Sequence, residues 1–302
     1  MPYRKDHTVA RSEDVDGVCM MGASRRGRSH AHNGTYRDDD FVIRSDKGGW
    51  FVVTVADGAG SAKYSRRGSD LMCAVATDRV LASVAAHCDD KFEKLLAQHR
   101  SAPTPEDEKQ IRTILYKVLI AAGYAGVRCI ESEARQMKAK LKDYATTLVL
   151  TVSKKYSFGW FVACFAIGDG GAALILDSKC GKVQVLNQQE SGEFSGQTRF
   201  ATMPEVWQDT DVLMKERLQF AIVDHFEALL AMTDGVSDPH FRTDVEFEDP
   251  QKWVDFWGAL RRDARIDEGD SKVLLDWLNF WVDGEHDDRT IALLTPGEMN
   301  DQ

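Results

Sequence analysis

The chain has 302 residues, with 48 acidic and 38 basic side chains, a formal net charge of −10 at pH 7 and a pI of about 5.3. This charge argues against a nucleic-acid-binding protein, which needs a basic face for phosphates. With 43% hydrophobic and 28% charged residues, an intrinsically disordered chain is also excluded. The acids divide into 32 Asp and 16 Glu. Two interpretations of this Asp excess stay open: a solvated surface, or short carboxylates that hold hard cations.

The predicted elements alternate between strands and helices. Residues 48–58 form a buried strand that ends in an Asp-Gly turn. Amphipathic periodicity predicts a helix from about Ser65 to His87 and a second one, capped by Thr104, that runs to about Leu141. Further along the chain we predict strands at 146–152, 158–167, 172–176, 182–186, 226–232 and 290–294, and a surface excursion or flap at 187–220. We also predict helices near 251–262 and 271–282. Their periodicity places Trp253, Trp257, Trp277 and Trp281 in the core or in a partner groove.

Helix pairs that alternate with blocks of closely spaced strands are typical of an α+β fold in which helices cover a β-sandwich. The chain shows no repeat and no linker long enough to divide domains, so we expect a single domain over residues 1–302.

The sequence also bears on compartment. The start of the chain has no apolar stretch typical of a signal peptide, and the longest apolar run, 158–168, is far short of the roughly 20 residues of a membrane helix. The six cysteines are widely spaced without a CxxC pair, which argues against a disulfide framework or a thiolate zinc site. We therefore expect a cytoplasmic protein that binds neither nucleic acid nor membrane.

Asp residues gather where predicted strands meet turns. The segments are RDDDF (37–41), VADGAGSA (55–62), FAIGDGG (165–171), MTDGVSDP (232–239) and EHDDRTIALL (285–294). Each Asp-Gly alone is an ordinary turn signal. Five such strand ends in one chain make converging carboxylates plausible, and converging carboxylates repel one another unless cations neutralise them. The pattern therefore favours a polynuclear Mg²⁺ or Mn²⁺ site.

The ordered set of motifs resembles the metal-dependent type 2C Ser/Thr protein phosphatases, particularly their compact bacterial members. The matching segments span residues 30 to 295 and are GTYRDDDFVI, VVTVADGAGSA, YATTLVLTV, FAIGDGGAALI, LLAMTDGVSDP and DDRTIALL. The resemblance implies a four-layer αββα fold, in which two antiparallel β-sheets pack as a sandwich flanked by helical pairs.

The resemblance also implies roles for individual residues. Asp57 would bridge two Mn²⁺ or Mg²⁺ ions, the Gly58 carbonyl would bind one of them, and Asp234 and Asp287 would complete the protein ligands of the other. Asp39 would hydrogen-bond metal-bound water, and Asp38 stands where Glu or Gln is usual. In bacterial relatives, the positions of Asp169 and Asp238 hold a third, weaker ion.

Two departures from the family pattern concern the substrate. Ala59 stands where eukaryotic relatives carry a His thought to protonate the leaving group, and Gly34 stands where many relatives carry a phosphate-clamping Arg. Arg28, His30, His32 or Arg37 could supply a replacement cation, although each of these residue types is more often an exposed polar side chain.

The main hypothesis is a protein-serine/threonine phosphatase that uses a dinuclear Mn²⁺ or Mg²⁺ site to activate water for direct in-line attack on phosphorus. The resemblance implies a phosphorylated protein as substrate, a cognate Ser/Thr kinase as partner and a bacterial signalling role, and we expect a monomer. A pseudophosphatase that binds phosphoproteins without turnover is the alternative that Ala59 and Gly34 suggest. A two-metal phosphodiesterase is a third hypothesis, which the acidic charge makes less attractive.

Overall fold

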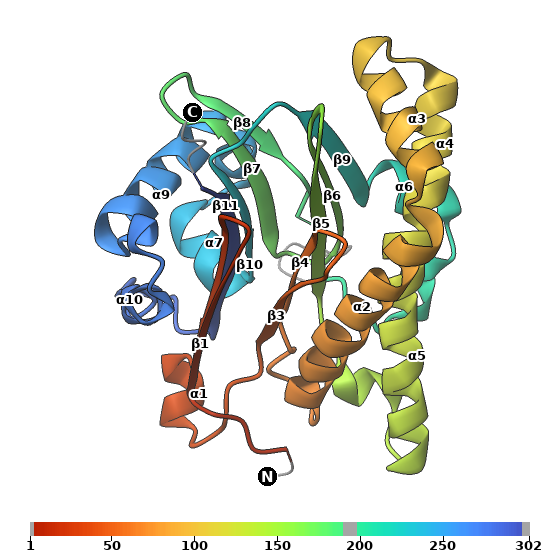
Figure 1. Ribbon diagram of the computed structural model, residues 1–302. Coiled ribbons are helices and arrows are strands. Elements are labelled where there is room, and N and C mark those ends of the chain that lie inside the picture. The colour runs from red at the N-terminus through yellow and green to blue at the C-terminus, as the bar shows by residue number, and fades with distance from the viewer. Residues whose placement is uncertain (1–2, 190–197, 298–302) are drawn as a thin grey trace.

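Two antiparallel sheets form the centre of the computed structural model, which describes residues 3–189 and 198–297 (Figure 1). The first sheet has the order β1 (Thr8–Val15), β2 (Val18–Arg25), β11 (Arg289–Pro296), β10 (Ala228–Met232), β7 (Gly171–Asp177) and β8 (Lys182–Val185). The second has the order β3 (Asp40–Ser45), β4 (Trp50–Ala56), β5 (Leu148–Tyr156), β6 (Gly159–Ile167) and β9 (Leu218–Val223). All neighbouring pairs are antiparallel, as the short turns predicted.

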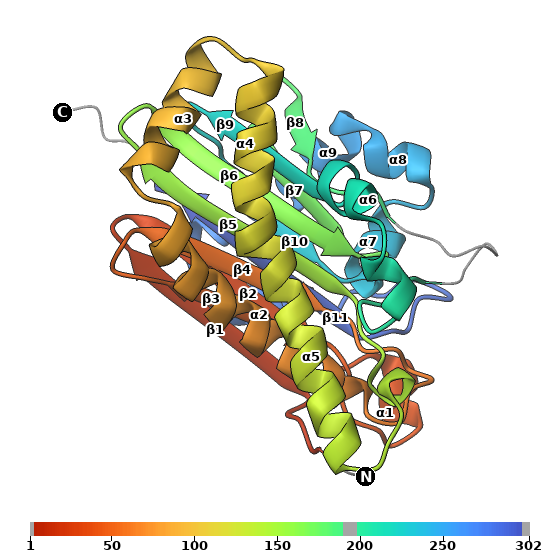
Figure 2. The same cartoon turned by 90° about the vertical axis from the view of Figure 1, so that its right-hand side faces the viewer.

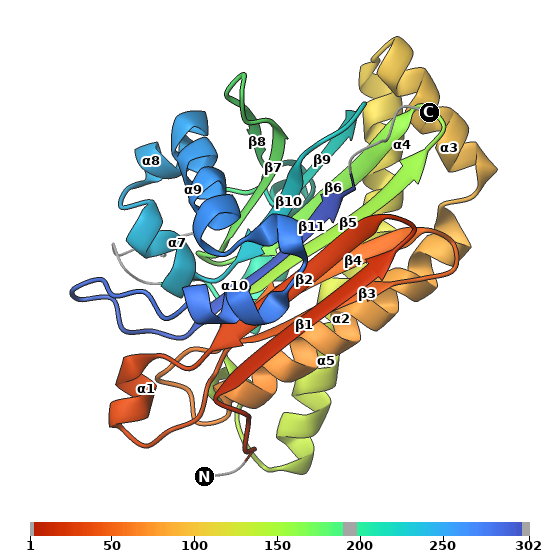
Figure 3. The ribbon, with the colours of Figure 1, turned by 60° about the vertical axis from the view of Figure 1, so that its left-hand side comes forward.

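Helices cover the outer face of each sheet. Those on the second sheet are α2 (Ser65–His87), α3 (Asp90–Ser101), α4 (Pro105–Leu115), one π-helical turn (Tyr116–Ile120) and α5 (Ala121–Gln136), as Figure 2 shows. Those on the first sheet are α7 (Asp234–His240), α8 (Asp244–Glu248), α9 (Pro250–Asp263) and α10 (Ser271–Trp277), as Figure 3 shows. Two short helices, α1 (Arg28–His32) and α6 (Thr210–Lys215), and 3₁₀ turns at 141–144, 204–207 and 266–268 complete the described elements. The predicted α+β sandwich with four αββα layers is confirmed.

Three apolar layers hold these elements together. Between the sheets lie side chains such as Val53, Leu174 and Leu294. Helices α2 to α5 bury a second set against the other face of β4, β5 and β6. Every residue of β4 is buried because both faces of its sheet are covered, which explains its unbroken apolar sequence. The third layer, between the first sheet and α7 to α10, contains Trp253 and Trp257.

The sequence located most inner strands and the long helices, but it missed several elements, among them the inner strand β2. The predicted helix Ser65–His87 has the observed bounds, whereas the helix expected to reach Leu141 ends at Gln136. Strands β1, β2, β3 and β9 and helix α3 were not predicted as elements. β1 lies at a sheet edge with no fully buried side chain, and α3 buries only two residues, so their apolar periodicity is weak.

The last predicted helix is shorter than expected. α10 ends at Trp277, which packs partly buried against the aromatic layer, whereas Trp281 lies beyond the helix with a side chain 63% exposed. The prediction of a core position is therefore wrong for Trp281, because the helix ends four residues before it, and the alternative of a partner groove stays a prediction.

The segment 187–220, expected as a surface excursion or flap, is largely integrated in its described part. Residues 198–220 contain α6 and the start of β9, and Ala201, Val206 and Leu213 are buried against the helices of the second sheet. Residues 190–197 of this segment lie outside the described part of the chain.

One helical stretch, Pro105–Gln136, is long and apolar enough to cross a membrane by length and composition, contrary to the expectation drawn from apolar runs. Half of its most apolar window is buried, and Ile111, Leu115 and Ile130 pack in the layer over the second sheet. α2 and α3 pass the same test only as a pair bent by 88°. In the described chain these helices are core elements of the sandwich.

Candidate metal centre

Strand register brings the predicted carboxylates to one end of the sandwich. Asp57 follows β4, whose last residue pairs with Asp40 at the start of β3, directly after Asp38 and Asp39. In the other sheet, Met232 at the end of β10 pairs with Gly171 at the start of β7 and with Ile291 near the start of β11. Asp234, Asp169 and Asp287 stand next to these three strand ends, so both sheets present acids at the same edge.

The carboxylates are close enough to oppose one another's ionisation. Burial, followed by the charges of Asp234 and Asp39, raises the pKa of Asp57 well above its ordinary value. Burial and the charges of Asp169 and Asp287 do the same for Asp234. Burial raises the pKa of Asp39 to about 7, with a further contribution from Asp288. Without a counter-charge, this end of the sandwich holds an unfavourable concentration of negative charge.

Asp238 and Asp287 lie at the exposed rim of the same cluster. Loss of hydration and the charge of Asp169 raise the pKa of Asp238 to about 7. Because the charge of Asp169 acts on Asp238, these two acids lie near each other at the positions for which the resemblance implies a third ion. Asp169 is held in turn by the Thr198 hydroxyl, which donates to its carboxylate.

This arrangement fits divalent cations. Hard cations such as Mg²⁺ and Mn²⁺ take carboxylate and backbone carbonyl oxygens, and their charge would relieve the repulsion. Asp39 Oδ1 and Asp169 Oδ1 are buried and have no hydrogen-bond partner among the described residues. Buried polar atoms are normally paired, so each oxygen is available to a bound group.

Local hydrogen bonds fix the orientation of two central acids. The backbone of Asp57 is held by Thr147: the Asp57 N–H donates to the Thr147 hydroxyl at 2.9 Å, and the Thr147 N–H donates to Asp57 O at 2.8 Å. Asp39 Oδ2 accepts from the hydroxyls of Thr233 at 2.8 Å and Thr290 at 2.7 Å. Asp39 therefore spans the two sheets, with one oxygen occupied by threonines and the other left for the centre.

The glycine of the Asp-Gly motif is needed for close packing at this end. A Cβ on Gly58 would lie 2.6 Å from Asp38 O, and one on Gly235 would lie 1.9 Å from Asp288 O. These distances are shorter than any non-bonded contact with a backbone oxygen. The two Asp-Gly motifs are therefore places where neighbouring backbones approach closely, as expected from the sequence.

Asp38 faces a different direction from Asp39. Its Oδ1 lies 2.9 Å from Arg66 Nε, and its Oδ2 lies 3.6 Å from His30 Nε2. These residues line an open pocket of about 570 Å³ beside the carboxylate cluster. Asp287 also lines this pocket. The pocket is the space from which a substrate could reach the cluster.

Asp288, which the sequence did not single out, joins three segments of the site. Its side chain is 1% exposed. Oδ1 accepts from Gly27 N at 2.6 Å and lies 2.9 Å from His30 Nδ1, while Oδ2 accepts from Asp38 N at 2.5 Å. These bonds connect the start of β11 to α1 and to the segment before β3. His30 in turn is held by Asp288, which raises the pKa of His30 to about 9 despite its burial.

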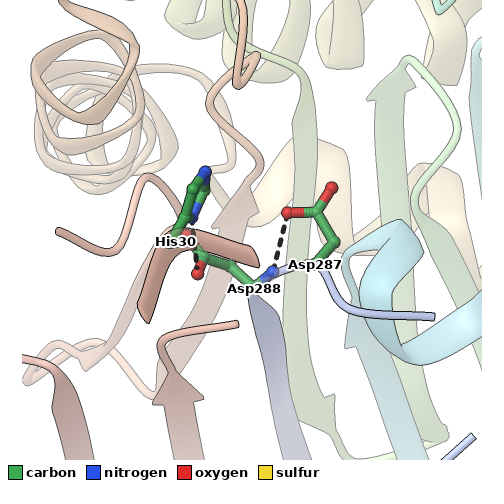
Figure 4. A group of neighbouring side chains, drawn as sticks. All are labelled: His30, Asp287 and Asp288. Atoms are coloured by element: carbon green, nitrogen blue, oxygen red, sulfur yellow. Dashed lines mark hydrogen bonds and ion pairs between the residues drawn. The ribbon is translucent and has the colours of Figure 1, made fainter. Parts of the chain in front are cut away.

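His30, Asp287 and Asp288 also lie within the spacing of a metal site, as Figure 4 shows. The contacts favour a hydrogen-bonded clamp instead. The Asp288 oxygens accept backbone N–H groups, and Asp287 Oδ1 accepts from Asp288 N at 2.7 Å. Because the Asp288 oxygens already accept hydrogen bonds from these donors, we assign Asp288 a positioning role.

Comparison with known sequences assigns the chain to a family. A sequence profile of the family described as Protein phosphatase 2C matches residues 26–279. The chain belongs to the protein phosphatase 2C family. It is accordingly a protein-serine/threonine phosphatase by family, and the predicted resemblance is confirmed.

Solved structures of similar fold extend over nearly the whole of this phosphatase 2C. The structure of RsbX in complex with magnesium superposes with a TM-score of 0.50 at 12% identity, covering 95% of this chain and 99% of that one. The Mycobacterium tuberculosis serine/threonine phosphatase PstP/Ppp matches with a TM-score of 0.48 at 15% identity, covering 93% and 99%. A search of curated protein sequences returned no match.

Of the predicted phosphate ligands in this phosphatase 2C, Arg37 is used inside the fold. Its side chain is buried, and Nη1 donates to Ser24 Oγ at 2.6 Å and to Asp39 O at 2.5 Å. The guanidinium therefore braces the Asp39 backbone, and the structure argues against its role as a phosphate ligand.

The other two candidates, Arg28 and His32, are the first and last residues of α1, and neither lines the pocket. The Arg28 guanidinium stacks over Trp281 at 4.2 Å from the ring centroid. His32 is exposed at the end of α1. Neither lines the pocket beside Asp38, whereas His30, which was also considered, does.

Sequence reasoning missed Arg66, Asp288 and the two threonines that hold Asp39. Arg66 gave no sequence signal, because its burial at the start of α2 is visible only in the structure. Asp288 had none, because it directly follows Asp287, the acid matched to the metal motif. Thr233 and Thr290 resembled ordinary strand-end residues.

Replacing Asp288 with Asn is expected to lower the free energy of unfolding by about 2–4 kcal/mol, because an amide has one acceptor oxygen for several buried donors. We also expect weaker activation by Mn²⁺, since the segments of Asp38 and Asp287 lose their link. Urea unfolding at neutral pH measures the first effect. Asp267→Asn, at an exposed pair with Arg261, is the matched control. A change below about 0.5 kcal/mol in D288N would contradict the positioning role.

Proposed function

We propose that this chain hydrolyses phosphoserine and phosphothreonine on proteins with a dinuclear Mn²⁺ or Mg²⁺ site, by direct in-line attack of water. The observation that carries the proposal is the convergence of buried and partly buried carboxylates from both sheets at one end of the sandwich. RsbX, a protein of the same fold, was solved with magnesium, which supports a divalent cation here.

The family resemblance supplies the proposed ligands, and the positions of the acids support them. Asp57 and the Gly58 carbonyl would hold the ions from the second sheet, and Asp234 and Asp287 from the first. Asp169 would join with Asp238 to hold a third ion. When bound, the ions would supply Lewis acidity that makes water acidic near neutral pH and would neutralise charge on the phosphoryl oxygens.

Side chains of the protein would orient the attacking water and the substrate. Asp39, fixed by the threonine hydroxyls, would keep its Oδ1 directed at the centre and accept a hydrogen bond from the attacking water. Asp38, paired with Arg66, would face the incoming substrate in the pocket. In this proposal the carboxylates hold the ions and the attacking water, and the pocket through which the substrate enters carries basic side chains.

The two buried cysteines, Cys73 and Cys164, are unsuited to form a covalent phosphoenzyme. Burial raises the pKa of Cys164 to about 12 and that of Cys73 well above its ordinary value, so neither is a thiolate near neutral pH. Both lie in the interior of the fold. The state of these two thiols is consistent with direct attack by water.

The pseudophosphatase alternative rests on Ala59 and Gly34. Gly34 has φ +66°, and a Cβ there would meet nothing within 4 Å, so a larger side chain would be disfavoured by the backbone and not by crowding. The convergence of the acids at one edge favours the enzyme. A substrate-binding protein without turnover would need no such concentration of charge.

An assay with p-nitrophenyl phosphate and a phosphothreonine peptide tests the proposed function. Activity is expected with Mn²⁺ or Mg²⁺ and should disappear with EDTA and return when the metal is restored. Activity that persists in EDTA would reject the metal mechanism. Tight phosphopeptide binding without release of phosphate would favour the pseudophosphatase.

The remaining predictions belong to the same proposal. We propose one domain over 1–302, supported by the core that both sheets share. A phosphorylated protein as substrate, a cognate Ser/Thr kinase, a monomeric state, a bacterial origin and a cytoplasmic location stay predictions that accompany this function.

A further inference from the structure

The pocket beside the metal centre carries cations as well as acids. Its wall is formed by α1, the loop after Gly58 and the start of α2, and both α1 and the start of α2 lie at the lower end of the molecule in Figure 1. Lys63, Arg66 and His30 contribute positive or ionisable nitrogen groups, and Asp38 and Asp287 contribute carboxylates. A ligand in this pocket therefore lies between basic side chains and the proposed ions.

Arg66 is the most constrained of these cations. Only 6% of its surface is exposed, its Nε lies 2.9 Å from Asp38 Oδ1, and its guanidinium carbon lies 5.5 Å from the centroid of the Tyr36 ring. A guanidinium keeps its charge at any physiological pH and can bind phosphate oxygens in a forked geometry. Asp38 and Tyr36 thus hold a permanent positive charge in the wall of the pocket.

The helix that carries Arg66 adds to this charge. α2 has 23 residues, and its first turn contains no acidic residue. The N-terminal end of such a helix bears a partial positive charge that favours anions. The field of α2 and the Arg66 side chain therefore act on the same side of the pocket.

The neighbouring arginines do not offer the same position. Arg37 donates to Ser24 and Asp39, Arg28 stacks on Trp281, and Arg67 pairs with Glu133 and Asp70. Of these four arginines, Arg66 is the one that lines the pocket next to Asp38 and Asp287.

We propose that Arg66 binds the phosphate group of the substrate, a phosphomonoester dianion, in this pocket. The inference rests on the proposed function, since it assigns the substrate-facing side of the same site. The phosphate would lie between the Arg66 guanidinium and the carboxylate-bound ions, with its ester group directed to the open side of the pocket. Arg66 then supplies the fixed cation that Gly34 does not.

The test compares Arg66→Gln and Arg66→Lys with Arg67→Gln, a matched change at the next residue, which lies outside the pocket lining. In the Mn²⁺-loaded proteins we expect R66Q to raise the KM for p-nitrophenyl phosphate and the inhibition constant of inorganic phosphate by about tenfold or more, as for loss of a hydrogen bond to a charged group. R66K should show a smaller rise of both constants, because an ammonium lacks the forked geometry. R67Q should stay within about twofold of the parent.

Two further measurements separate a loss of phosphate binding from damage to the metal centre or to the fold. Mn²⁺ titration and thermal unfolding of each variant establish that the metal centre and fold are intact. A loss confined to kcat, with KM and phosphate inhibition unchanged, would overturn the proposal and leave Arg66 as a residue that positions Asp38. If R66Q does not fold, unchanged phosphate inhibition in R66K overturns the proposal.

Failure of the inference can be told apart from failure of the proposed function. Calorimetric titration of the Mg²⁺-loaded parent and of R66K with inorganic phosphate requires no turnover. A parent that binds phosphate through Arg66 but releases none from phosphopeptides supports the pocket and rejects the enzyme. A parent that is active, with phosphate affinity equal in all variants, supports the enzyme and rejects the role of Arg66.

Discussion

Asp57→Asn is expected to reduce kcat/KM for p-nitrophenyl phosphate on the order of 10³-fold or more. The proposed ions share this carboxylate, and a bound ion supplies several kcal/mol of transition-state stabilisation. An amide is a weaker ligand and lacks the charge that holds two cations. The variant should also require a much higher Mn²⁺ concentration for half-maximal activity.

The same substitution should stabilise the metal-free protein. Asp57 is opposed by burial and by the charges of Asp234 and Asp39, so a neutral side chain of the same shape removes an unfavourable charge. In EDTA the melting temperature of D57N should therefore exceed that of the parent. A substitution that lowers activity and raises the stability of the metal-free protein would indicate that this carboxylate serves to bind cations.

The control for this pair of measurements is Asp255→Asn, on the exposed side of α9. It should change neither the Mn²⁺ requirement nor the melting temperature appreciably. An Asp57→Asn protein with activity within tenfold of the parent and unaltered Mn²⁺ affinity would reject the ligand assignment. A lower melting temperature in EDTA would reject the electrostatic argument.

Raising the pH from about 5.5 to 8 in EDTA should destabilise the metal-free parent. The folded pKa of Asp39 and of Asp238 is about 7, above the roughly 3.9 of an unfolded Asp. The folded protein therefore binds more protons than the unfolded one between these values. The stabilisation from these protons is complete below the unfolded pKa and is lost as the pH rises through about 7.

Divalent cations should reverse this trend, because they bind the ionised carboxylates of the folded protein. The increase in melting temperature on adding Mn²⁺ should be larger at pH 8 than at pH 5.5. Since about 1 kcal/mol shifts the melting temperature of a protein of this size by roughly 2–4 °C, we expect differences of several degrees. Differential scanning calorimetry at matched ionic strength measures both effects.

Two comparisons make this result specific to the site. The D57N protein in EDTA should show a weaker pH dependence than the parent, because one of the coupled acids is gone. Comparing Ca²⁺ or Mg²⁺ with Na⁺ at equal ionic strength separates the binding of divalent cations from general screening of charge. Equal stabilisation by Na⁺ at the same ionic strength, or stability that rises with pH in EDTA, would contradict the prediction.

Much of the fold follows from local patterns. The periodicity of Ser65–His87 and the unbroken apolar run of β4 reflect burial on one face or on both faces, which a single segment reveals. Strands at the edges, such as β1, alternate only weakly because solvent covers part of them. The inner strand β2 lies between the adjacent β1 and the distant β11 at the other end of the chain, so its place in the sheet depends on a partner that the local sequence does not show.

The candidate site divides in a similar way. The acids at strand ends were recognisable because an Asp-Gly turn after an apolar strand is a local feature and its repetition in family order is specific. The substrate side was not recognisable. Arg37 has the sequence position of a plausible phosphate ligand, yet its guanidinium donates to Ser24 and Asp39.

The excess of Asp over Glu, ambiguous as a composition, gains its meaning at the strand ends, where short carboxylates next to turns can converge. That much is encoded locally, because the type of residue and the end of a strand are both properties of a few adjacent positions. The pairing of Arg66 with Asp38 and the bonds of Asp288 to Gly27, His30 and Asp38 are not. They join side chains up to about 260 residues apart, so only the packing of the two sheets brings the cations and the positioning carboxylate to the pocket.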